Sequence, residues 1–161
     1  MAITQAVANA FKKQLLEGDH NFTQTTGDKF KLALYVSTAT LNSSTTAYTA
    51  TGEVGDSGQY AAGGGALVNN GTSVASGVAI VDFADLSFTG VTLTARGALI
   101  YNTSSATTNA AGNGTAVVNA GNVIDNSSKT TIVNQKLYDD NIVRFGAYTV
   151  AEFGLVSYGT N

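Results

Sequence analysis

The chain has 161 residues and contains neither cysteine nor proline. Without cysteine there can be no disulfide framework and no thiolate metal site, so the sequence indicates no redox compartment. Without proline, every turn has to be made by glycine, asparagine, aspartate or serine. Tryptophan is also absent, and His20 is the only histidine. Chemistry that depends on thiolates or on several imidazoles is therefore excluded.

Charged residues are scarce as well. They make up 12% of the chain, about half the usual share, and the net charge is −3. Only two of the basic residues, Lys12 and Lys13, are adjacent, whereas nucleic-acid binding requires clustered basic residues. No apolar run reaches the roughly 18 residues of a membrane helix, and residues 1–11 do not resemble a secretory signal. We expect no nucleic-acid or membrane partner, and a chain that is soluble or assembled inside the cell that makes it.

The most regular pattern lies in residues 78–102. Two strand-like runs, 78–88 and 91–101, meet at Thr89-Gly90 and predict a central hairpin. Apolar and polar residues alternate along the second run, which predicts one buried face and one face in contact with water or a partner. This run also contains Arg96. We interpret Arg96 either as a solvent-facing arginine or as a partner in an interface or an ion pair with Asp82 or Asp85.

Residues 2–17 are predicted to form an N-terminal helix ending at Gly18. One apolar stripe follows the helical spacing and consists of Ile3, Val7, Phe11 and Leu15. The stripe can pack against the chain's own sheet, or it can dock on a neighbouring subunit. With Arg96, these four residues are the candidate partner contacts of the sequence.

Short strands are predicted for most of the remaining chain. They lie at residues 28–37, 66–70, 115–120, 130–134, 141–148 and 153–158. Long Ser/Thr/Gly loops are expected at residues 38–65 and 103–114, the first of them ordered by Leu41, Tyr48 and Val54. The pattern predicts a single domain, residues 1–161, that is mainly β. We expect an antiparallel β-sandwich or jelly-roll-like barrel at residues 28–161, with one N-terminal α-helix at residues 1–18.

No group of residues predicts catalysis. His20 lacks the partners of a triad or a metal site, and is more simply a loop histidine. Gly63-Gly64-Gly65 is not followed by the Lys-Ser/Thr of a phosphate loop, so we expect these glycines to serve positive φ angles and close packing. Asp82 and Asp85 match no calcium-binding loop. We therefore expect no enzyme activity, no catalytic residue, no cofactor and no metal.

Five segments resemble a family of known proteins in their order along residues 2–102. They read FKKQLLEGDHNF, DKFKLALYVSTATLNSSTTAYTATGEV, GQYAAGGGAL, VAIVDFADLSF and LTARGALIYN. Together they are similar to small virion structural proteins of tailed bacteriophages. The resemblance does not extend beyond Thr103. It implies a virion component that is assembled in the host cytoplasm, without fixing its place in the particle.

The function expected from this resemblance is structural and non-enzymatic. Our first hypothesis is a capsid decoration or cement protein that stabilises contacts between capsid subunits, as a homo-oligomer or a symmetric array. Its partners would be the major capsid protein or tail proteins. A tail, collar or fibre-base protein is the first alternative. The second is a carbohydrate- or receptor-binding β-sandwich, in which Tyr35, Tyr48, Tyr60 and Tyr101 could stack on sugars.

Overall fold

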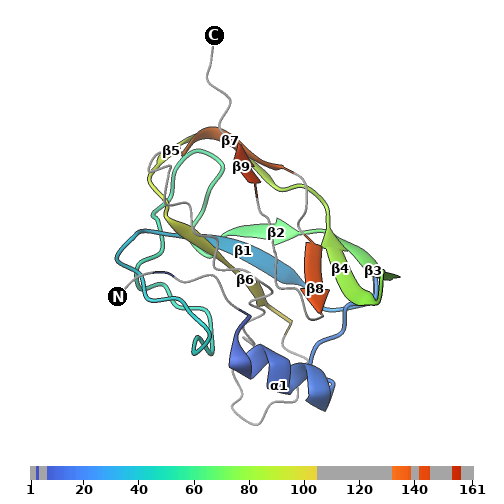
Figure 1. The fold of residues 1–161 in the computed structure, drawn as a ribbon. Helices are drawn as coiled ribbons and strands as arrows, with labels where there is room; N and C mark the ends of the chain where they lie inside the picture. The colour runs from blue at the N-terminus through green and yellow to red at the C-terminus, as the bar shows by residue number, and fades with distance from the viewer. Residues whose placement is uncertain (1–2, 4–6, 105–131, 139–141, 146–153, 157–161) are drawn as a thin grey trace.

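A computed structural model describes residues 3, 7–104, 132–138, 142–145 and 154–156. This part of the chain contains one α-helix and nine β-strands, and every strand pairing in it is antiparallel (Figure 1). The mainly β class with a single N-terminal helix is therefore confirmed. The elements are α1 Asn9–Glu17, β1 Phe30–Tyr35, β2 Gly65–Leu67, β3 Asn69–Ala75, β4 Val78–Phe83, β5 Ser87–Leu93, β6 Gly97–Asn102, β7 Ile132–Tyr138, β8 Ile142–Phe145 and β9 Gly154–Val156.

The strands form three small sheets. Their strand orders are β2-β1-β6, β3-β4-β8 and β5-β7-β9. In Figure 1 the first sheet lies centrally, with α1 below it, β3, β4 and β8 at the right, and β5, β7 and β9 at the top. The C-terminal strands therefore complete sheets that the first two thirds of the chain begin: β8 pairs with β4, and β7 pairs with β5.

The pair of β1 and β6 forms the centre of the core. Their register runs over six residue pairs, from Phe30 opposite Asn102 to Tyr35 opposite Gly97. All six residues of β6 are buried, and so are five of the six residues of β1. Side chains alternate between the two faces of a strand, so both faces of this pair are covered. The prediction that one face of the run 91–101 meets water is wrong for the residues of β6.

The predicted central hairpin is also wrong. Thr89 and Gly90 lie inside β5 instead of forming a turn, and residues 94–96 separate β5 from β6. β4 pairs with the preceding strand β3, through a turn at Ser76 and Gly77, whose φ angles are 49° and 78°. Two consecutive positive φ angles are typical of the tight turn whose twist matches that of paired strands. The hairpin therefore turns at Ser76-Gly77, and the run 78–88 is divided between β4 and β5.

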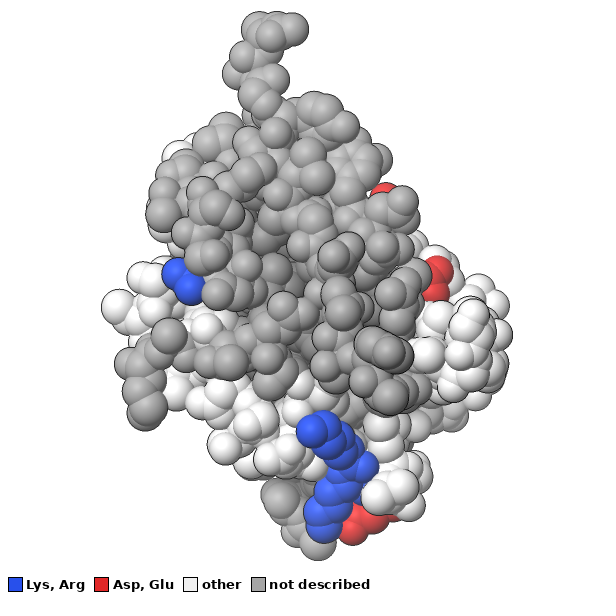
Figure 2. Space-filling view, in the orientation of Figure 1, with Lys and Arg blue, Asp and Glu red and all other residues white. Residues whose placement is uncertain are grey.

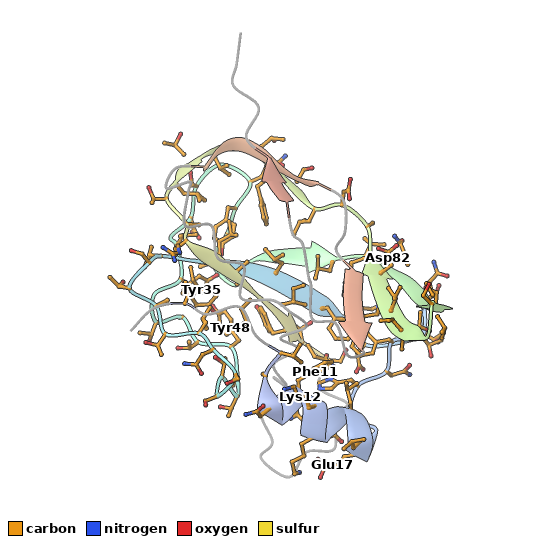
Figure 3. All side chains as sticks on the ribbon, in the orientation of Figure 1. Phe11, Lys12, Glu17, Tyr35, Tyr48 and Asp82 are labelled. Atoms are coloured by element: carbon orange, nitrogen blue, oxygen red, sulfur yellow. The ribbon has the colours of Figure 1, made fainter. Side chains whose placement is uncertain are left out.

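The helix is shorter than expected. Residues 2–17 were predicted to be helical, but α1 begins at Asn9, and Ala8 is extended with φ −61° and ψ 138°. The C-terminal cap is confirmed, because Gly18 adopts the left-handed conformation with φ 78°. Phe11 is fully buried, and Figure 3 shows it on the side of α1 that faces the central sheet.

Several predicted strands agree with the structure within a few residues. Residues 28–37 contain β1, residues 130–134 overlap β7, residues 141–148 contain β8 and residues 153–158 contain β9. The segment 66–70 overlaps both β2 and β3. The predicted strand 115–120 and the predicted loop 103–114 beyond Ser104 lie outside the described residues. Within the described part of the chain, no helix is long and apolar enough to cross a membrane.

Candidate functional site

Glu53 lies at the centre of the most organised polar cluster among the described residues. Its carboxylate accepts hydrogen bonds from the hydroxyl of Tyr48, the hydroxyl of Tyr60 at 2.8 Å and the amide of Gly63 at 2.6 Å. The Tyr60 hydroxyl in turn accepts a hydrogen bond of 2.8 Å from the amide of Leu34 in β1. Tyr60, which Glu53 holds in place, therefore supplies a polar partner to a backbone amide of β1 beyond the three residues that pair with β2.

Two further tyrosines complete this Glu53 cluster. The Tyr101 hydroxyl, from β6, donates to the carbonyl of Gly63 at 2.6 Å, and its ring stacks on Tyr48 with centroids 4.7 Å apart. The Tyr35 hydroxyl, from β1, donates to the carbonyl of Thr49 at 2.7 Å. Tyr35 and Tyr48 lie near each other at the left of the central sheet in Figure 3. The cluster thus ties the long segment 38–65 to the two central strands.

Burial raises the pKa of every tyrosine in the cluster. The pKa of Tyr101 is raised to about 12, first by burial and then by the negative charge of Glu53. The pKa values of Tyr35, Tyr48 and Tyr60 are also raised, for the same leading reason. These hydroxyls therefore stay protonated to higher pH than an ordinary tyrosine does, and they act as hydrogen-bond donors. Chemically, the arrangement is a set of donors around one carboxylate that holds the segment in place.

The same tyrosines were candidates for stacking on sugars. Tyr35, Tyr60 and Tyr101 are 0%, 1% and 5% exposed, and Tyr48 is half-buried. A sugar-stacking platform requires an exposed ring face. These tyrosine rings pack within the protein itself. Their placement gives no support to the carbohydrate-binding alternative at these four positions.

The glycine run next to this cluster serves close packing, as the sequence predicted. Gly63 and Gly64 have φ angles of 92° and 75°. A Cβ atom on Gly64 would lie 2.0 Å from the carbonyl oxygen of Leu32 in β1. A Cβ atom on Gly65 would lie 2.8 Å from the ring of Phe88. The run lets the backbone approach the central sheet where a larger residue would collide.

His20 belongs to a second polar cluster, which joins α1 to the central sheet. Its Nδ1 lies 3.1 Å from Nδ2 of Asn102, which also donates to Asp28 at 2.7 Å. Its Nε2 lies 3.2 Å from Oε1 of Gln14 in α1. Asn102 is fully buried, and its Oδ1 accepts a hydrogen bond of 2.8 Å from the amide of Ser104. His20 is therefore a buried structural histidine instead of an ordinary loop residue.

The network determines which His20 nitrogen carries the proton. Asp28 can only accept and the Ser104 amide can only donate, so Asn102 must direct its amino group towards Asp28 and His20. Nδ1 of His20 then accepts a hydrogen bond, and Nε2 carries hydrogen and donates to Gln14. Burial lowers the pKa of His20, against the opposing charges of Asp28 and Asp19. The neutral imidazole is the form that fits this site.

The predicted partner contacts on the helical stripe pack into the chain's own core. Ile3 and Phe11 are 3% and 0% exposed, and Val7 and Leu15 are half-buried against the core. This placement corresponds to the intramolecular alternative for the stripe. Sequence reasoning did not single out Leu16, which is 92% exposed on α1.

Arg96 lies between β5 and β6 rather than within a strand, and it is half-buried. Its amide donates to the carbonyl of Tyr35 at 2.7 Å, which continues the pairing of β6 with β1. The hairpin that was expected to bring Arg96 opposite Asp82 or Asp85 is not formed. Asp82 accepts a hydrogen bond of 3.0 Å from Asn70 at the base of the β3–β4 hairpin.

An uncharged surface lies over this hairpin and the residues before it. Val74 and Val68 are 75% and 65% exposed, and no charged residue occurs from residue 57 to residue 81. Figure 2 shows the right-hand side, over β3 and β4, in white with acidic atoms at its upper border. A shallow hollow of about 270 Å³ lies on the hairpin and is lined by Phe22, Thr72, Ser73, Val74, Ala79, Ile80 and Val81. Within the described residues there is no group of histidine and acidic side chains that could hold a metal ion.

Glu53 is the residue that sequence reasoning missed. It is the only charged residue between Lys31 and Asp56, and such an isolated charge among small polar residues was the signal available. Comparison with known proteins identifies no relative: no family model, no curated protein and no solved structure matches this chain.

Proposed function

We propose that this protein is a non-enzymatic structural component of a tailed-bacteriophage virion, and specifically a capsid decoration or cement protein. The observation that carries the proposal is the order of the five segments in residues 2–102 that resemble small phage virion proteins. A protein of this kind stabilises contacts between capsid subunits by burying surface in many symmetric copies. Its partners would be the major capsid protein and further copies of itself.

The use of polar side chains in the structure supports a scaffold role. In the Glu53 cluster, and in the second cluster around His20, Asn102 and Asp28, the polar side chains form hydrogen bonds with the protein's own backbone and side chains. Both link segments that are distant in the sequence, as a rigid building block requires. A tail, collar or fibre-base protein would have the same needs, so it remains the second candidate.

We further propose that the three sheets belong to one sandwich or jelly-roll-like barrel. Support comes from β1 and β6, which are buried on both faces and therefore require a layer on each side. In such an architecture the β3–β4 hairpin would project from one end, where its exposed residues could meet a neighbouring subunit.

Counting the copies of this chain in purified particles tests the proposal. We expect quantitative mass spectrometry to find it in hundreds of copies per particle, in a fixed ratio to the major capsid protein. About six or twelve copies would instead place it in the tail or neck, because those structures have sixfold or twelvefold symmetry. Its absence from purified particles would refute the virion role altogether.

A further inference from the structure

β3 is an edge strand that the described part of the chain leaves open. Its sheet has the order β3-β4-β8, so only one side of β3 is paired. The strand has seven residues, and its burial decreases towards the hairpin turn, with Thr72, Ser73, Val74 and Ala75 all exposed. An open edge presents unpaired backbone amides and carbonyls that can pair with another strand.

The other edges among the described strands differ from β3. β6 is buried along its whole length, and β2 has only three residues. β5 is covered by the segment around Ser57, because the Ser57 side chain bonds to the amide and carbonyl of Thr92, and the Gln59 amide donates to the carbonyl of Thr89. β8 and β9 have four and three residues. β3 is therefore the longest described edge without such a cover.

Natural proteins usually protect an exposed edge with lysine, proline, an inward-pointing charge or a bulge. β3 contains no proline and no charged residue. Its one irregularity is a register shift between Asn69 and Gly71, at the end of β3 that is farther from the turn. From Thr72 to Ala75 the pairing with β4 is regular, so no bulge protects this part of the edge against another strand.

We propose that β3 pairs with β3 of a second copy of this chain, antiparallel and around a twofold axis. The inference deepens the proposed function and rests on it, because it names the surface through which copies join. Around a twofold axis each residue of β3 meets a residue of the same strand, so like charges would oppose one another if the strand were charged. The absence of any charge from residue 57 to residue 81 removes this repulsion and favours a second copy over a charged partner.

The test introduces charged side chains on the open edge of β3. Thr72 and Val74 are exposed and two residues apart, so they share one face of β3. We expect the wild-type chain to change from one chain of 16.4 kDa to twice that mass in sedimentation experiments as its concentration rises towards about 1 mM. The double variant Thr72→Lys/Val74→Lys should remain at the mass of one chain. The same should hold for Thr72→Glu/Val74→Glu, and an equimolar mixture of the two variants should restore the dimer.

Leu16→Lys is the matched control, because it also places a lysine at an exposed apolar residue, on α1. It should dimerise as the wild type does. Amide exchange adds a second measurement: the amides of residues 72–75 should gain protection with concentration in the wild type and not in the lysine variant. A wild-type chain that remains monomeric, a lysine variant that dimerises normally, or a mixture that stays monomeric would each overturn the proposal.

This outcome can be separated from that of the copy-number experiment. A monomeric chain that is nevertheless present in purified particles would overturn the β3 pairing and leave the virion role standing, with the edge then open to a different capsid or tail protein. A chain that dimerises through β3 but is absent from particles would overturn the virion role alone.

Discussion

Gly64 and Gly90 both have positive φ angles, of 75° and 65°, but their surroundings differ. A Cβ atom on Gly64 would lie 2.0 Å from the carbonyl oxygen of Leu32, whereas a Cβ atom on Gly90 would meet nothing within 4 Å. A side chain at Gly90 would therefore be penalised only by the backbone conformation, whereas a side chain at Gly64 would also collide with β1. At the residue scale, the absence of a side chain at Gly64 lets the backbone next to the Glu53 cluster lie against Leu32 of the central sheet.

Substitution of these glycines by alanine measures the two effects. Gly90→Ala should lower the free energy of unfolding by about 1–2 kcal/mol, because only the left-handed conformation is penalised. Gly64→Ala should cost about 2–5 kcal/mol, because the collision with β1 is added to the same conformational penalty. Urea denaturation of both variants gives the comparison. Equal losses would show that the backbone at Gly64 can move away from Leu32 at little cost.

His20 predicts a dependence of stability on pH. Its pKa is lowered in the folded protein, while in the unfolded chain it is expected near 6.5. Above that pH both states are neutral and His20 makes no difference. As the pH falls below about 6.5, the unfolded state takes up a proton that the folded state resists, so stability decreases by at most about 1.4 kcal/mol per pH unit from this group.

The variant His20→Gln removes this titration while keeping an oxygen that can accept the hydrogen bond of Asn102. We expect the wild type to lose stability more steeply than the variant between about pH 6.5 and pH 5, as measured by urea denaturation. The charged groups facing His20 are Asp28 and Asp19, and they are present in both proteins. Parallel curves for the two proteins would refute the neutral, buried histidine.

At the scale of elements, β6 is the strand whose described residues are all buried. Its sequence GALIYN reads as a nearly continuous apolar run, and all of its residues are buried. Leu99 and Ile100 are both 0% exposed, although neighbouring residues of a strand point to opposite faces. Thr92 belongs to a different strand, β5, and is exposed.

Truncations on the two faces of β6 should therefore be similarly destabilising. We expect Leu99→Ala and Ile100→Ala each to lower the free energy of unfolding by about 2–5 kcal/mol, because each removes buried methyl groups and leaves a cavity. Thr92→Ala should cost less than about 0.5 kcal/mol, since its side chain is exposed. If Ile100→Ala were as mild as Thr92→Ala, one face of β6 would have to be solvated in solution. Urea denaturation again decides between these outcomes.

At the scale of the whole molecule, the Glu53 cluster connects elements that no local interaction would join. It includes side chains from β1, from the segment 38–65 and from β6. Its tyrosines retain their protons to higher pH than tyrosines in an unfolded chain, whose pKa is about 10. Deprotonation of the unfolded chain is then favoured over that of the folded protein, so alkaline pH should lower the free energy of unfolding of the whole molecule.

We expect stability to fall as the pH rises above about 10, the unfolded pKa, and to keep falling through the folded pKa of Tyr101 at about 12. Absorbance of tyrosinate and circular dichroism, recorded in the same titration, should show these tyrosines ionising together with the loss of structure. Glu53→Gln keeps acceptor capacity but removes the charge, so its tyrosines should ionise at lower pH. Ionisation of all tyrosines near pH 10 in a folded protein would contradict the buried cluster.

The sequence by itself determined the mainly β fold class and many local features of the structure. Period-two alternation predicted the strands, helical spacing placed Phe11 on the buried side of α1, and the glycine at residue 18 ended that helix. These features depend on backbone dihedral preferences and on neighbours a few residues away, which a single sequence contains. The sequence also indicated the four tyrosines of the Glu53 cluster, but as exposed rings that could stack on sugars.

Only the tertiary structure decided which strands pair and what the polar residues do. Two turn-forming pairs, Ser76-Gly77 and Thr89-Gly90, were available for the hairpin, and the choice of the first depends on the pairing of β4 with both β3 and β8. Likewise, β6 joins β1 across more than sixty residues of intervening chain. The partners of Glu53 and His20 come from these long-range pairings. Apolar runs are compatible with several pairings, and the burial of all of them together selects one.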